Sequence, residues 1–340
     1  MGAVRKTGVE APERSPAGAG RPGAVAADRV AHVKVGAESE GQRLDNFLLR
    51  IAKGVPKSHV YRVVRSGEVR VNKGRVPVDY RLVAGDEVRV PPMRLAEARP
   101  AATPFAPADM PPVLYEDEHL LVVDKPAGLA AHGGSGVAHG LIERVRAARP
   151  NQPFLELAHR LDRETSGLLL LAKTRRALVG LHAQLREGRV DKRYLALVKG
   201  DWVNDRQHVR LALTKYVTRE GERRVNVDPE GAASHTVFTL VKRFGRFSLL
   251  EAELRTGRTH QIRVHLAHLG FPIVGDDKYG DFDLNKALAR ADARPRLARM
   301  FLHAGSVRLT HPVGGQPLLF EAPLPPECAT FLKGLDGAPL

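Results

Sequence analysis

The sequence predicts an α+β protein with two folded domains. The chain has 340 residues, 43% hydrophobic and 27% charged, which is the composition of a globular protein with a full core. The apolar run at residues 168–172 has the length of one buried strand, and residues 236–240 and 247–254 have the pattern of an antiparallel pair. Residues 175–187 instead have the apolar spacing of a helix. This combination indicates the α+β class.

Composition divides the chain into four segments. Residues 1–28 are rich in Gly, Ala, Pro and Arg without apolar periodicity, which predicts a disordered basic tail. Residues 41–91 have the pattern of a small domain, and residues 92–112 form a proline-rich linker. Residues 113–330 contain the larger domain.

The small domain is predicted to contain two short helices and a hairpin. The apolar residues of its first helix recur at helical spacing, namely Leu44, Phe47, Leu48 and Ile51. We expect Ser58 to cap the second helix and residues 72–74 to turn between two strands. Its candidate contacts to a polyanion are the cations Lys57, Arg62, Arg65, Arg70 and Lys73. The alternative is that they form only a solvated face.

Charge and cysteine content narrow the class further. The formal net charge is +15, from 53 Lys+Arg against 38 Asp+Glu, and such a surface attracts polyanions, of which nucleic acid is the commonest. The single cysteine, Cys328, excludes an intramolecular disulfide framework and a thiolate zinc cluster. No apolar run has the length of a membrane span, and the N-terminus lacks the apolar core of a signal peptide. We therefore expect a cytoplasmic protein.

The most informative stretch is a polar loop, residues 159–167, that precedes the apolar run. It places the carboxylate of Asp162 between Arg160 and Arg163 at the start of a buried strand. Burying charges is costly unless they are paired, so a core strand gains nothing from such a loop. Either Asp162 forms a structural ion pair there, or it belongs to an active site.

A second polar stretch, residues 255–265, leads into a helix. We expect Thr259 to cap this helix and Arg263 to lie at the edge of its apolar stripe. His260, His265 and His268 invite a metal-site interpretation. Their spacing does not match a HExxH pattern, so we predict no metal site.

Several motifs resemble one family. His159-Arg160-Leu161-Asp162-x-x-Thr165-Ser166-Gly167, Asp124-Lys125-Pro126-Ala127-Gly128 and Thr256-Gly257-Arg258-Thr259-His260-Gln261-Ile262-Arg263 resemble the signatures of RluA-type pseudouridine synthases. Residues 41–91, with Arg43-Leu44-Asp45-x-Phe47-Leu48, resemble the S4 RNA-binding domain. The resemblance implies a catalytic domain built on a mixed, largely antiparallel sheet with a central cleft, joined to a small α/β S4 domain.

The resemblance also implies the chemistry and the residues that perform it. The expected activity is conversion of uridine to pseudouridine in large-subunit (23S) ribosomal RNA by a monomer that needs no cofactor. Asp162 would be the catalytic carboxylate, Arg263 would pair with it, and Tyr194 would pack against the target base. Arg160 would fill the gap that the flipped base leaves. Lys125 would lie near the RNA-facing cleft and contact RNA, as would the five cations of the S4-like segment named above.

Two other functions remain open from the residues alone. One is an S4-bearing ribosome-assembly factor that binds RNA without modifying it. The other is a metal-dependent RNA hydrolase that uses the histidines. Intact Asp162, Tyr194 and Arg263 favour the enzyme over the binding protein.

Overall fold

The computed structural model describes residues 29–52, 55–93, 110–133 and 139–336. The predicted basic tail and most of the predicted linker lie outside these residues. The chain divides into two compact units, Met1–Ala102 and Thr103–Leu340, and both mix helices with strands. The α+β class is thus confirmed, while the finer domain boundaries given above stay predictions.

The first unit packs two helices on a small antiparallel sheet. The sheet has the strand order β1-β3-β2. Its elements are β1 (Ala31–Lys34), a 3-10 turn at Ala37–Ser39, α1 (Leu44–Ile51), α2 (Lys57–Arg65), β2 (Arg70–Val71) and β3 (Glu87–Val90). The predicted stripe of α1 is buried, together with Val60, Val63 and Val64 of α2. The two predicted helices are therefore confirmed.

Three local details of this unit differ from the prediction. Strand β1 was not predicted, because its four residues alternate between exposed and half-buried positions and give little apolar signal. Helix α2 begins at Lys57 after Pro56, so Ser58 is not its cap; proline already supplies the extended backbone that precedes a helix. Asn72 and Lys73 do form a turn with positive φ, but β2 pairs with β3.

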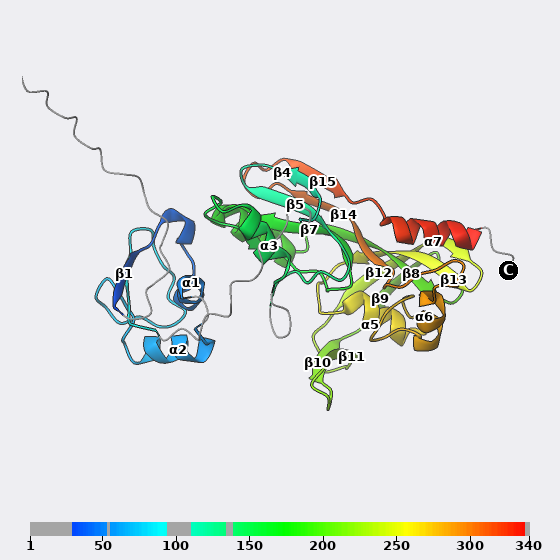
Figure 1. The fold of residues 1–340 in the computed structure, drawn as a ribbon, viewed down its shortest axis with the longest axis horizontal. Coiled ribbons are helices and arrows are strands. Elements are labelled where there is room, and N and C mark those ends of the chain that lie inside the picture. The colour runs from blue at the N-terminus through cyan, green and yellow to red at the C-terminus, as the bar shows by residue number, and fades with distance from the viewer. Residues whose placement is uncertain (1–28, 53–54, 94–109, 134–138, 337–340) are drawn as a thin grey trace, which may run out of the picture. The chain divides into compact units, whose positions relative to one another are not determined.

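The second unit is built on a ten-stranded sheet (Figure 1). Its strands are β4 (Val113–Glu116), β5 (Leu120–Lys125), β6 (Glu156–Leu157), β7 (Ser166–Ala172), β8 (Asp191–Lys199), β9 (Arg206–Arg210), β12 (His235–Phe244), β13 (Phe247–Leu254), β14 (Leu302–Thr310) and β15 (Pro317–Glu321). The main path runs β4-β5-β7-β14-β8-β13-β12-β9. Only the β7–β14 pairing in this sheet is parallel. The predicted mixed, largely antiparallel sheet is confirmed.

Strand β7 is buried along its whole length, as the apolar run predicts. Gly167 near its start has φ +108°, and a Cβ there would lie 2.3 Å from the carbonyl oxygen of Ala304 on β14. Only glycine permits both this φ and this close approach. Gly167 therefore has a structural role: it allows β7 to pair closely with β14 near the centre of the sheet path.

Five helices pack around this sheet. They are α3 (Leu141–Ala148), α4 (Arg175–Arg186), α5 (Gln261–His268), α6 (Phe282–Ala289) and α7 (Pro326–Asp336). The expected cap of α5 is wrong: His260 precedes the helix in a left-handed conformation, and Thr259 does not cap it.

A two-stranded hairpin, β10 (Leu213–Val217) and β11 (Arg223–Val227), extends away from the sheet (Figure 1). Within the part of the chain that is described, no helix combines the length and apolar character that crossing a membrane would need.

Candidate active site

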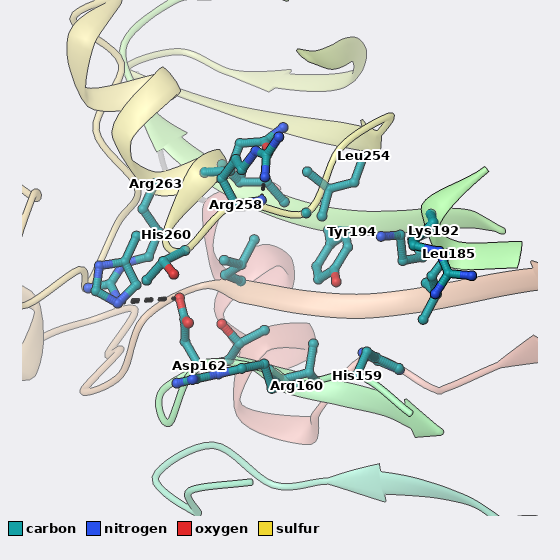
Figure 2. Close-up of a pocket in the computed structure, with 18 residues that line it drawn as sticks. His159, Arg160, Asp162, Leu185, Lys192, Tyr194, Leu254, Arg258, His260 and Arg263 are labelled. Carbon is teal, nitrogen blue, oxygen red and sulfur yellow. Dashed lines mark hydrogen bonds and ion pairs between the residues drawn. The ribbon is translucent and has the colours of Figure 1, made fainter. Parts of the chain in front are cut away.

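A cleft of about 430 Å³ opens between the loop before β7 and the N-terminus of α5. Strand β8 and the end of α4 complete its walls. Figure 2 shows Asp162 and Arg160 along one side, His260 and Arg263 facing Asp162, and Tyr194 along the cleft wall. This volume lies in the range of small-molecule sites. The predicted central cleft is thus present and contains the predicted acid.

Lys125 holds the loop that carries Asp162. Its side chain is completely buried, and Nζ donates to the carbonyl oxygens of Pro126, Leu129 and Arg163 at 3.0, 2.8 and 3.1 Å. Burial lowers the pKa of Lys125 to about 7. The prediction that Lys125 contacts RNA is therefore wrong, because an ammonium enclosed by carbonyl groups cannot reach a phosphate. Through its bond to the carbonyl oxygen of Arg163, Lys125 instead holds the loop that carries Asp162 against the end of β5.

Ser166 anchors the other end of the same loop. Its hydroxyl accepts a hydrogen bond from Arg299 Nη2 at 2.8 Å and lies 2.9 Å from His303 Nδ1. Ser166 and His303 are fully enclosed by the protein. The serine and the glycine of the motif thus shape the loop, whereas the Asp162 side chain lines the cleft.

Arg263 approaches Asp162 from α5. Its Nη1 lies 3.7 Å from Asp162 Oδ2, while the guanidinium is 2% exposed and the carboxylate 22% exposed. The distance is that of an ion pair without a hydrogen bond. The predicted pair is therefore present, and Asp162 keeps access to the cleft.

The main partner of Arg263 is Asp276, which was not predicted as a site residue. Nε and Nη2 of Arg263 donate to the two oxygens of Asp276 at 2.7 and 2.6 Å, and Nη2 also donates to Asp277 at 3.0 Å. Asp276 is completely buried. A bidentate buried pair fixes a guanidinium in one orientation. The available signal was the acidic pair Asp276-Asp277 directly after the apolar Ile273-Val274 and Gly275.

Tyr194 and Lys192 lie two residues apart on β8, so both side chains face the same side of the sheet and line the cleft. Figure 2 shows them side by side. Burial raises the pKa of Tyr194 well above its ordinary range and lowers the pKa of Lys192. The tyrosine therefore offers a flat ring with a protonated hydroxyl. Lys192 was not predicted as a site residue.

Positive side chains also line the cleft. Besides Arg263, the arginines that line it are Arg160, Arg186 and Arg258. Arg160 is exposed. These side chains suit a polyanionic substrate, since guanidinium groups bind phosphates well.

The predicted cations of the first unit form two groups. Lys57, Arg62 and Arg65 line one shallow hollow on α2 together with Tyr61. The ring of Tyr61 has Lys57 Nζ at 5.4 Å and Arg65 Cζ at 5.8 Å from its centroid. Arg70 and Lys73 instead belong to β2 and the turn that follows it, and do not line that hollow.

The three histidines of residues 260–268 point to different surroundings. His260 lines the cleft, and His268 is exposed. His265 is buried, and its Nε2 lies 2.8 Å from Ser234 Oγ. Among the described residues, no group of three or more His, Cys, Asp or Glu side chains is placed to hold a metal ion.

A mixed sheet with an acid, a guanidinium and a tyrosine in its cleft is the arrangement expected of a pseudouridine synthase. Residues 119–268 match the RNA pseudouridylate synthase family, and residues 42–88 match the S4 domain family. The similarity to curated relatives extends over 90% of the chain at 50% identity. The chain belongs to the pseudouridine synthase family and carries an S4 domain, as its motifs predict.

Two similar bacterial proteins of this family carry the same name. The ribosomal large subunit pseudouridine synthase C of Escherichia coli strain K12 is 50% identical over 312 residues, which cover 90% of this chain and 97% of that protein. The protein of the same name from Pasteurella multocida is 49% identical over 302 residues, covering 88% and 91%. Human RNA Pseudouridylate Synthase Domain Containing 4 shares the fold at a TM-score of 0.54 and 24% identity, covering 66% of this chain and 92% of that one.

Proposed function

We propose that the protein converts uridines of large-subunit ribosomal RNA into pseudouridine and that Asp162 is its catalytic carboxylate. The observation that carries this proposal is the Asp162 side chain, which is 22% exposed in the cleft and lies 3.7 Å from a guanidinium that is 2% exposed. The relatives named for this substrate provide the choice of RNA.

The reaction is an isomerisation, in which a glycosidic carbon–nitrogen bond breaks and a carbon–carbon bond forms on the rotated base. Its atoms balance without a second substrate. The guanidinium of Arg263 forms an ion pair with the Asp162 carboxylate and attracts its Oδ2 toward α5. An ionised and oriented carboxylate inside a cleft can act as nucleophile or base.

The target nucleotide leaves its stack to enter the cleft, which costs a few kcal/mol. The ring of Tyr194 packs against the extruded uracil and recovers part of this cost. Arg160, exposed on the same loop as Asp162, occupies the space that the base vacates in the RNA. Both roles follow from positions next to Asp162 and from the family resemblance.

The S4 domain supplies affinity. Lys57, Arg62 and Arg65 are exposed on one helix and contact phosphates, and Arg70 and Lys73 extend the contact from a second surface. A cytoplasmic location and a monomeric state accompany this proposal, as predicted from the sequence.

One experiment separates the enzyme from an RNA-binding assembly factor. Unmodified ribosomal RNA is incubated with the wild-type protein or with Asp162→Asn, and pseudouridines are mapped. Product with the wild type and none with the variant supports the proposal. Absence of product with both proteins, despite RNA binding by both, would favour the assembly factor. Deleting the gene and mapping pseudouridines in the large-subunit RNA then identifies the target positions.

A further inference from the structure

His260 occupies an unusual position at the mouth of the cleft. Its backbone has φ 52° and ψ 21°, the left-handed region that residues with a Cβ adopt rarely. Its side chain is 14% exposed and lines the cleft beside Asp162. Strain of this kind persists where surrounding contacts hold the residue, and it is concentrated at functional sites. The contacts of the imidazole show what holds it.

Tyr279 determines which ring nitrogen carries the proton. The backbone N–H of Val225 donates to the Tyr279 hydroxyl oxygen at 2.9 Å, and the same oxygen lies 2.9 Å from His260 Nδ1. Burial raises the pKa of Tyr279, so the hydroxyl keeps its proton. Among the described residues, His260 Nδ1 is the partner within hydrogen-bond distance that can accept the Tyr279 O–H, because the backbone N–H of Val225 is itself a donor, so the hydroxyl donates to Nδ1. A neutral His260 then carries its own proton on Nε2.

Nε2 faces the catalytic carboxylate. It lies 3.8 Å from Asp162 Oδ2, the same oxygen that Arg263 Nη1 approaches at 3.7 Å. Both groups approach Oδ2 at distances longer than a hydrogen bond, which leaves Oδ1 of the same carboxylate for the uridine. Catalytic hydrogen bonds are often this long in a free enzyme and shorten in the complex with substrate.

We propose that His260 is a positioning residue for the reaction: its Nε2–H, set by Tyr279, holds Oδ2 of Asp162 so that Oδ1 faces the uridine. This inference rests on the proposed role of Asp162. It extends that role because neither the family motifs nor the pairing with Arg263 assigns a function to His260.

The neighbours of His260 favour the neutral ring. Burial lowers the pKa of His260, Asp162 opposes this shift, and the positive charges of Arg263 and Lys278 lower the pKa further. The ring thus acts as a hydrogen-bond donor of fixed tautomer. A neutral donor stabilises the carboxylate through a directed bond and leaves the ionic partner role to Arg263.

Two substitutions separate this role from packing. His260→Asn tolerates the left-handed backbone and retains a polar atom toward Tyr279, but has no donor at the Nε2 position. His260→Gln extends an amide N–H toward that position. We expect the single-turnover rate at saturating RNA to fall about 10- to 100-fold for His260→Asn and less than about fivefold for His260→Gln. The dissociation constant for RNA should change less than about twofold in both. His268→Asn, at an exposed position on the helix that His260 precedes, is the matched control.

The tautomer itself is measured by ¹⁵N NMR of protein labelled at histidine. The wild-type protein should show His260 protonated at Nε2, and Tyr279→Phe should convert it to a mixture of tautomers. Tyr279→Phe should also slow the single-turnover rate, with no further effect in a His260→Asn background.

Three outcomes would overturn the inference: protonation at Nδ1 in the wild type, equal losses for His260→Asn and His260→Gln, or full activity of His260→Asn. Asp162→Asn is assayed in parallel. If it is also fully active, the proposed catalytic role of Asp162 fails; if it is inactive while His260→Asn is fully active, only the role of His260 fails.

Discussion

The surface of helix α2 and the cleft of the second unit both carry positive side chains, but they differ in the burial and the pairing of these charges. On α2, Lys57, Arg62 and Arg65 are exposed, and no carboxylate among the described residues forms an ion pair with them. In the cleft, Arg263 is buried and shared between Asp276 and Asp162. Exposed charges attract a polyanion at a distance and are screened by salt. A buried pair is screened little and fixes geometry. We therefore expect the exposed cations of α2 to contribute affinity for RNA and the buried Arg263 to contribute to the reaction.

Removing the buried guanidinium should produce the largest effect. Arg263→Ala leaves Asp276 buried without its bidentate partner, which should cost about 3–5 kcal/mol of unfolding free energy. It also removes the guanidinium that pairs with Asp162. We expect kcat to fall by about 100-fold or more, with RNA affinity nearly unchanged. Denaturant unfolding, single-turnover kinetics and filter binding measure the three quantities.

A double variant tests whether this loss of activity is only a loss of stability. Arg263→Met with Asp276→Leu replaces the buried pair with apolar side chains, which often restores or exceeds the original stability. We expect a folded protein that remains inactive. Recovery of activity together with stability would show that Arg263 acts only on the fold.

Lys125 tests the difference between a buried and an exposed lysine. Lys125→Met leaves three buried carbonyl groups without their donor and should cost about 1–3 kcal/mol of unfolding free energy. Because Arg163 O is one of them, the Asp162 loop should loosen and kcat should fall. The matched control is Lys199→Met. The side chain of Lys199 is 51% exposed and pairs with Asp281, so this substitution should cost less than about 1 kcal/mol of unfolding free energy. Equal costs would contradict the assigned difference.

The sequence predicted the cleft well because its motifs are local. The polar loop before β7, the strand carrying Tyr194 and the helix carrying Arg263 are each continuous segments. Lys125 was misassigned because a lysine after an apolar strand gives no sign that the chain folds three carbonyl groups around it. Asp276 and Tyr279 were missed for a similar reason. Their contacts with α5 depend on a loop whose path the sequence pattern does not specify.

Strand β1 shows the corresponding limit in the small unit. Its four residues are paired with β3 by backbone hydrogen bonds, yet none is fully buried. Alternation over so short a segment is weak evidence for a strand. The helices of the same unit were predicted because their stripes fill its core.

The buried histidines of the catalytic unit should make it sensitive to acid. Burial lowers the pKa of His265 to about 4, against about 6.5 in an unfolded chain. Above pH 6.5 both states are neutral; between about pH 6.5 and 4 only the unfolded state takes up the proton, so stability falls as pH falls. Each such histidine changes the free energy of unfolding by up to about 1.4 kcal/mol per pH unit in this range. Urea unfolding from pH 7.5 to 4.5 measures it, and His265→Gln should show a shallower slope than the wild type. An unchanged slope would contradict a neutral buried His265.

The smallest effects should come from single cations on α2, because each contributes one screened contact among several. Arg62→Ala should weaken binding to ribosomal RNA only a few-fold and reduce the slope of log affinity against log salt by about one. The single-turnover rate at saturating RNA should stay at the wild-type value, since Arg62 belongs to the other compact unit. Arg290→Ala is the control: this arginine is exposed but paired with Asp292, so its removal should leave the salt slope unchanged. Equal slope changes for both variants would mean that net charge alone, and not the α2 surface, determines affinity. A reduced rate for Arg62→Ala at saturation would mean that the outer charges also take part in the chemistry, and the division between the two surfaces would fail.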